Sequence, residues 1–349
     1  MKNKKEIYKA YHHNKEPADE KTKKLILNVN DKENYVLHIK ILKYYLKQGL
    51  KLKKINRAIM FRQKEWLKPW IDFNTDKRKQ ATSDFEKDMY KLMNNAVYGK
   101  TMENVREHIN FELVDTPERF QKVVNAPTYK HRHIINENLV GVEKLKETVK
   151  LNKPIYVGMS ILDLSKLHMY SFYYDVLKKK YEDKVRLIYT DTDSFVTHIE
   201  TEDIYDDFNN IKKHMDFSGY DKEHKCYDPT NKKVLGKFKD EVDGKIITHF
   251  IGLKPKSYAF KIYKQEKEEK KSKGVVKHKV KKELNYNKYL ETLEHNRCDT
   301  VSFNSIRSKN HQIYSINQVK QALSSYDNKR YYLDSVNSLP FGFYSISQD

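Results

Sequence analysis

The feature that most constrains the fold of this chain is an acidic pair set between two short apolar runs. Residues 186–189 and 194–197 both have the composition of β-strands. Asp191 and Asp193 lie between them, so the sequence predicts an antiparallel hairpin with both carboxylates at its tip. Carboxylate oxygens are hard ligands that suit Mg²⁺, which would also relieve the repulsion between the two charges. An acidic surface turn with solvated charges is the alternative interpretation.

A second pattern lies upstream, over residues 91–99. On a helix with about 100° between successive residues, Lys91, Asn95 and Tyr98 fall on one face. A cation, an amide and an aromatic ring on one face could contact the phosphates, the base and the sugar of a nucleotide. The alternative is an amphipathic helix that buries Tyr98 and ends at Gly99.

Together the two patterns resemble motifs B and C of family B DNA polymerases. Residues 91–99 (KLMNNAVYG) are similar to motif B, and residues 189–194 (YTDTDS) are similar to motif C. Lys256-Ser257-Tyr258 resembles the KxY element that follows, residues 154–158 resemble the palm segment between the motifs, and residues 273–283 resemble the thumb. The similarity is to the protein-primed branch of viruses, linear plasmids and virus-like transposons.

The resemblance implies an α+β fold arranged as a right hand, with fingers, a partial palm of antiparallel sheet and helices, and a thumb. It divides the chain into a flexible segment (1–34), a palm–fingers connection (35–75), fingers helices with motif B (76–108), a palm with the motif C hairpin (109–253), and the KxY element, thumb and tail (254–349).

The activity that the resemblance implies is DNA-directed DNA synthesis, in which a nucleotidyl group passes from a dNTP to a primer 3′-OH at a two-metal Mg²⁺ site. Asp191 and Asp193 would be the catalytic carboxylates and metal ligands, with Asp193 the more direct ligand. Lys91 would neutralise triphosphate charge, while Asn95 and Tyr98 would line the nascent base pair.

Contacts with primer–template DNA are also implied. Gly99 would let the template backbone approach closely. Tyr189 and Thr192 would position the hairpin and the primer end, and Lys256 and Tyr258 would hold the primer strand. The expected partners are therefore primer–template DNA, dNTPs and a terminal priming protein.

The chain departs from the family pattern in three ways. Ala96 replaces the usual serine of motif B, no exonuclease acidic motif precedes the fingers, and no motif A aspartate is visible before motif B. Asp163 begins a faint echo of motif A, but it lies in the wrong order and fits a helix core. Residues 205–207 (YDD) are similar to the reverse-transcriptase YxDD, yet they lack apolar flanks and favour an acidic surface turn.

We therefore expect the C-terminal half of a polymerase, which lacks one bridging carboxylate and has little activity by itself. The alternative is a catalytically inactive remnant that only binds primer–template DNA. A reverse transcriptase or RNA polymerase fits the YTDTDS run and the helical motif B less well.

The charge balance agrees with a polyanionic partner without deciding for one. Lys and Arg (68) exceed Asp and Glu (48), which gives +20 over 349 residues. An AT-rich coding sequence would also enrich lysine.

Two distant cysteines, Cys226 and Cys298, and the absence of a long apolar run or secretory leader predict an intracellular protein without a membrane span. The nucleus or a viral replication site is expected.

Hydrophobic periodicity supplies the remaining expectations. It predicts helices over 35–50, 76–102 and 159–180, and a strand over 52–61. Residues 111–149 are expected to be strand-rich with a turn at Thr116-Pro117, residues 236–244 to form strand–turn–strand, and the tail beyond about residue 297 to be partly helical.

Overall fold

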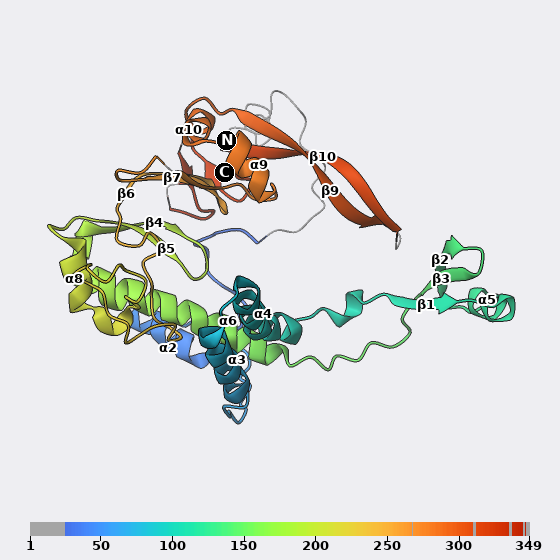
Figure 1. The fold of residues 1–349 in the computed structure, drawn as a ribbon. Helices are drawn as coiled ribbons and strands as arrows, with labels where there is room; N and C mark the ends of the chain where they lie inside the picture. The colour runs from blue at the N-terminus through green and yellow to red at the C-terminus, as the bar shows by residue number, and fades with distance from the viewer. Residues whose placement is uncertain (1–24, 267, 310–311, 335–336, 345, 347–349) are drawn as a thin grey trace. The chain divides into compact units, whose positions relative to one another are not determined.

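The computed structural model describes residues 25–266, 268–309, 312–334, 337–344 and 346, which form a mixed α+β structure with antiparallel sheets (Figure 1). The chain divides into two compact units. The first unit comprises residues 37–170 and the described part of 306–314. The second comprises the described parts of 1–36, 171–305 and 315–349. The division at 170/171 lies inside the segment 109–253 assigned to a palm.

The first unit is built on four helices: α2 (Ile39–Lys47), α3 (Lys68–Gln80), α4 (Asp84–Thr101) and α6 (Ile155–Tyr170). α4 contacts α3 and α6, and α2 contacts α6. α4 begins with a capping box, because the Ser83 hydroxyl accepts the Glu86 N–H while the Glu86 carboxylate accepts the Ser83 N–H. This cap splits the helix predicted over 76–102 into α3 and α4. The helix predicted over 35–50 is confirmed as α2.

A small sheet completes the first unit. Its order is β1–β3–β2, all antiparallel, and it packs Val114, Val142 and Val123 into a small core. The expected turn at Thr116-Pro117 is instead the start of a helix with proline in its first turn, where a missing N–H costs nothing. The elements are η1 (Val105–Glu107), β1 (Asn110–Val114), α5 (Pro117–Val124), β2 (Tyr129–Asn136) and β3 (Leu139–Lys144).

The strand predicted over 52–61 is wrong. The chain there has no regular structure, and Ile55, Ile59 and Met60 are exposed. Alternating apolar residues form a strand only when a neighbouring strand accepts their backbone hydrogen bonds, and none of the strands in the described residues pairs with this segment.

The second unit begins by continuing the α6 helix. The helix predicted over 159–180 is confirmed, and its second half is a π-helical stretch, Ser171–Lys178, followed by α7 (Lys179–Tyr181). Its apolar side packs Phe172, Leu177 and Tyr181 against a core completed by the loop after α8. The following elements are η3 (Glu182–Lys184), β4 (Val185–Thr190), β5 (Phe195–Ile199), α8 (Ile204–Asn210) and η4 (Lys212–His214).

The rest of the second unit is a three-stranded antiparallel sheet, β6–β7–β8, covered on one face by helices. Ile251, Leu253 and Ala259 on this face are buried with residues of α9, α10, β9 and β10. The elements are β6 (Ile247–Lys254), β7 (Ser257–Ile262), β8 (Glu268–Lys271), α9 (Lys277–Glu283), α10 (Tyr286–Glu294), β9 (Cys298–Lys309), β10 (Gln312–Ser324), β11 (Tyr331–Tyr332) and β12 (Ser338–Leu339). Residues 306–309 of β9 and 312–314 of β10 are counted with the first unit.

Two predictions in this unit are wrong. Residues 236–244 form no strand pair, because the Asp240 side chain accepts the N–H groups of Val242 and Gly244 and Phe238 stacks on Phe172 at 3.9 Å between ring centroids. The tail after residue 297 is a long two-stranded ribbon, β9 and β10, rather than partly helical. Its strands form because Val301 and Leu323 are buried in the core shared with α10.

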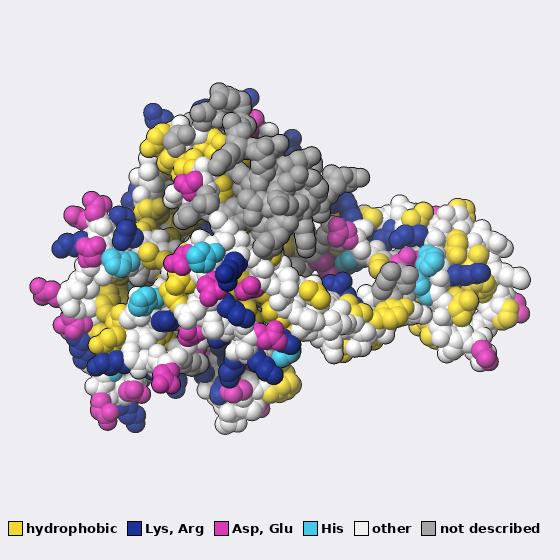
Figure 2. All heavy atoms as spheres, turned by 90° about the horizontal axis from the view of Figure 1, so that it is seen from above, with side chains coloured by type: hydrophobic (Ala, Val, Ile, Leu, Met, Phe, Trp, Pro, Cys, Tyr) yellow, Lys and Arg dark blue, Asp and Glu magenta, His cyan; other side chains and the backbone are white. Residues whose placement is uncertain are grey.

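No helix in the described residues is both long enough and apolar enough to cross a bilayer. Most of the flexible segment expected over 1–34 lies outside the described residues. Basic side chains are interspersed with acidic ones on the face drawn in Figure 2.

Candidate active site

The acidic pair lies at the tip of the β4–β5 hairpin, as predicted. Thr190 pairs with Phe195, so residues 191–194 form the tip. The Asp191 N–H donates to the Ser194 carbonyl (3.2 Å), and the Asp193 N–H donates to the Asp191 carbonyl (2.6 Å). Thr192 has φ +60°, the left-handed conformation that allows so tight a tip. The Asp191 side chain is 27% exposed, and Thr192 and Asp193 are exposed.

The KxY element meets this hairpin in space. Lys256 occupies the turn between β6 and β7, with Pro255 before it and φ +62°. Its backbone N–H donates to the Tyr189 hydroxyl (2.9 Å), and its Nζ lies 3.4 Å from Asp191 Oδ1. The Tyr258 ring lies 5.0 Å from the Tyr189 ring, centroid to centroid. The fold thus brings Tyr189 and Asp191 together with Lys256 and Tyr258.

Sequence reasoning missed a third residue at this place, Lys271 on β8. Its Nζ lies 5.6 Å from the Tyr258 ring centroid. A hydrogen bond with Tyr258 raises the pKa of the Lys271 ammonium, and the nearby charges of Glu241 and Asp191 act in the same direction. Lys271 is the register partner of Tyr258. It stands in the Lys/Glu run 264–282, which by sequence fits either a solvated linker or, by the resemblance, thumb contacts with the duplex backbone.

The motif B residues lie on α4, as predicted. Lys91 and Asn95 are exposed and Tyr98 is half-buried. The neighbouring Asn94 instead faces α3, where its amide donates to Thr75 Oγ1 (3.3 Å). Gly99 does not end the helix, which continues to Thr101. A Cβ at this glycine would meet no atom within 4 Å.

Lys91, Asn95, Tyr98 and Gly99 belong to the first unit, and the acidic hairpin with the KxY turn belongs to the second.

The hairpin offers the type of ligand that Mg²⁺ prefers, but it offers too few of them. Asp191 and Asp193 offer hard carboxylate oxygens, and Asp191 already has the Lys256 ammonium beside it. Across the described residues, no three acidic, histidine or cysteine side chains gather closely enough to hold a metal ion. The two aspartates therefore supply part of a ligand set.

The two other acidic sequence patterns, at Asp163 and at residues 205–207, have structural partners. Asp163 is buried in α6, and its Oδ2 accepts the His38 N–H (2.7 Å) at the start of α2. Residues 205–207 are the first turn of α8 rather than a surface turn. Lys225 lies 2.7 Å from Asp206 Oδ1, and Lys180 lies 2.7 Å from Asp207 Oδ1. The charges of these two carboxylates are therefore balanced by neighbouring lysines.

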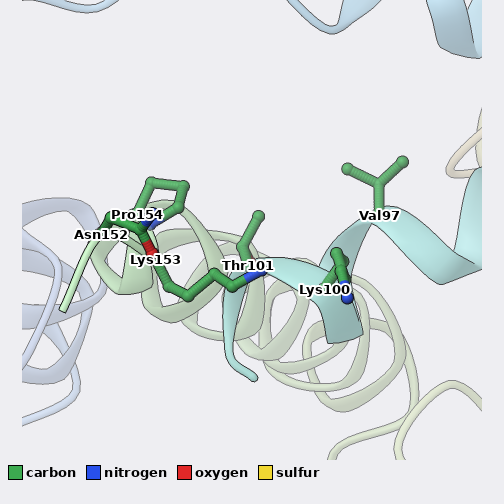
Figure 3. Close-up of a pocket in the computed structure, with 6 residues that line it drawn as sticks. All are labelled: Val97, Lys100, Thr101, Asn152, Lys153 and Pro154. Atoms are coloured by element: carbon green, nitrogen blue, oxygen red, sulfur yellow. The ribbon is translucent and has the colours of Figure 1, made fainter. Parts of the chain in front are cut away.

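An open hollow of about 390 Å³ lies where the end of α4 meets residues 152–154 (Figure 3). The Nζ atoms of Lys100 and Lys153 lie 2.8 and 2.7 Å from Glu103 Oε2. Hydrogen bonds with these lysines lower the pKa of Glu103 to about 2. None of the predicted site residues lines the hollow, whose walls are Val97, Lys100, Thr101, Asn152, Lys153 and Pro154.

The chain matches no protein-family model, no curated protein and no solved structure.

Proposed function

We propose that this chain takes part in template-directed DNA synthesis as a family B-type polymerase component. The observation that supports this most is the meeting of the acidic tip with the KxY turn. Tyr189 and Lys256 stand 67 positions apart in sequence, yet the Lys256 N–H donates to the Tyr189 hydroxyl and the ammonium reaches Asp191. A cation, two carboxylates and two neighbouring tyrosine rings at one place suit a primer end and a metal-bound phosphate.

Each group then has a role. Asp191 and Asp193 would hold Mg²⁺, which when bound would polarise the reacting phosphate and lower the pKa of the attacking hydroxyl. Lys256 and Tyr258 would hold the primer strand.

On α4, Lys91 would neutralise triphosphate charge, and Asn95 and Tyr98 would contact the incoming base pair. The exposure of Lys91 and Asn95 leaves both side chains available. The open space at Gly99 suits the close approach of a template backbone.

The incomplete ligand set favours a second candidate function, binding of primer–template DNA without chemistry. Two carboxylates with a lysine beside one of them would hold Mg²⁺ weakly. Catalysis would then require a further carboxylate from another polypeptide segment.

Primer extension separates the two functions. The chain is incubated with a primer–template, dNTPs and Mg²⁺ or Mn²⁺, and compared with Asp193→Asn. The matched control is Asp183→Asn, a fully exposed carboxylate near the end of α7. Slow incorporation that disappears in Asp193→Asn but persists in Asp183→Asn supports synthesis. Salt-sensitive DNA binding without incorporation supports the binding function, and the absence of both would refute both.

A further inference from the structure

An aromatic surface extends from the KxY turn along β6 and β7. The Phe250, Tyr258 and Phe260 rings lie with their centroids 5.7, 6.2 and 6.5 Å apart, and their planes differ by at most 26°. All three side chains are half-buried. They alternate with Ile251 and Ala259, which are buried in the core, so the rings occupy the opposite face of the sheet.

The composition of this face is unusual for a sheet whose other face packs on the core. An antiparallel sheet with one face on the core normally presents polar side chains on its other face. Here three aromatic residues occupy it, and Gly252, the register partner of Tyr258, adds no side chain. None of the three rings is part of the buried hydrophobic clusters of this unit.

Anchoring the acidic hairpin accounts for only part of this surface. The Tyr189 ring lies 5.7 Å from Phe250 and 5.0 Å from Tyr258, so these two rings support the hairpin. Phe260 lies farther along β7, where it pairs with Phe250 on one side and Glu269 on the other. The Phe260 ring therefore does not help to hold the acidic tip.

The charges beside the rings indicate the chemistry of an occupant. Lys256 precedes Tyr258 by two residues on the turn, and its side chain is 59% exposed. The Lys271 Nζ lies over Tyr258 at 5.6 Å from the ring centroid. Flat rings with exposed lysines at their margin suit a polyanion that carries planar groups, which is a nucleic-acid strand.

An unpaired strand fits better than a duplex. Bases within a duplex are covered on both faces by their neighbours, so an aromatic ring can reach a base face only at a duplex end or in a single strand. Two rings on β7 and a third on β6 have room for more than a terminal base.

We propose that Phe250, Tyr258 and Phe260 form a stacking surface for unpaired bases of a DNA strand, with Lys256 and Lys271 contacting its phosphates. This inference rests on the proposed function for its ligand, and it adds Phe250 and Phe260 as binding residues that the sequence patterns did not assign.

The test measures binding of the full chain by fluorescence anisotropy. The probes are a fluorescein-labelled single-stranded oligodeoxythymidylate and a blunt DNA hairpin of the same length. Phe260→Leu keeps an apolar side chain but removes the ring, and we expect it to weaken single-strand binding by about 5-fold to about 150-fold. Binding of the blunt hairpin should change much less, and Phe260→Tyr should restore single-strand binding.

Tyr263→Leu is the control, because Tyr263 is an exposed aromatic residue with a lysine over its ring, Lys264 at 5.2 Å, but lies beyond the end of β7. Thermal unfolding of each variant shows whether it folds. Unchanged single-strand binding in a folded Phe260→Leu protein would overturn the proposal, as would an equal loss for both probes or no single-strand binding by the unaltered chain.

The outcome is separable from that of primer extension. Loss of single-strand binding in Phe260→Leu without any incorporation would support this surface and count against synthesis. Incorporation with unaltered single-strand binding would support synthesis and refute this surface.

Discussion

Lys256 combines a strained backbone with an exposed charge in one residue. Lys256 is the second residue of a two-residue turn, after Pro255, and its φ is +62°. This position of a turn favours glycine. A non-glycine residue held there costs about 1 kcal/mol or more. The exposed ion pair with Asp191 contributes about 0–1 kcal/mol, so it offsets little of that strain. Lysine at this turn therefore lowers stability, which agrees with the proposed role of its charge.

Two substitutions at this residue separate strain from charge. Lys256→Gly relieves the strain and Lys256→Ala keeps it, while both remove the ammonium. We expect the glycine variant to be about 1 kcal/mol more stable than the alanine variant by urea denaturation. Both should bind primer–template DNA equally weakly. A glycine variant less stable than the alanine variant would contradict the strain argument.

At the scale of elements, α4 and α6 each carry a glycine for a different reason. A Cβ at Gly158 of α6 would lie 2.4 Å from Met102 Cγ and 2.7 Å from Thr101 Oγ1, so this glycine allows close packing against the end of α4. Thr101 is buried and its hydroxyl is fixed on the Tyr98 carbonyl. A Cβ at Gly99 of α4 would meet nothing within 4 Å.

Gly99→Ala and Gly158→Ala should therefore have opposite effects. Gly99→Ala should raise the free energy of unfolding by about 0.5–1 kcal/mol, because alanine is the better helix former. Gly158→Ala gains the same propensity but should lose about 1–3 kcal/mol to overpacking. Urea denaturation gives both values. If Gly99 faces a template strand, Gly99→Ala should also weaken primer–template binding; a more stable variant with unchanged DNA binding would remove that role.

For the whole molecule, the charge of +20 would strengthen the proposed DNA binding where its cations contact phosphates. We expect the affinity for a primer–template to fall steeply between about 50 and 200 mM salt, because bound phosphates release counterions. Lys256→Ala should reduce the slope of log K against log salt by about 1. Lys225→Ala is the control, since Lys225 is already paired with Asp203 and Asp206. Equal slopes for both variants would show that the charge acts only as a diffuse field.

Local patterns in the sequence predicted local structure well. The hairpin with its acidic tip and the helix with Lys91 and Asn95 on its surface are both observed. Spacings of two and of three to four residues fix which side chains share a face, so no distant partner is needed. The same reasoning failed for residues 52–61 and for β9 and β10, because a strand depends on what lies beside it.

By itself the sequence determined the hairpin with its acidic tip and the helix that carries residues 91–99, because each depends on neighbours only a few positions away. Only the tertiary structure decided that Lys256 would reach Asp191 and that Phe250 and Phe260 would align with Tyr258. The physical reason is the register of β6, β7 and β8 over their buried core, which positions side chains that are far apart in sequence.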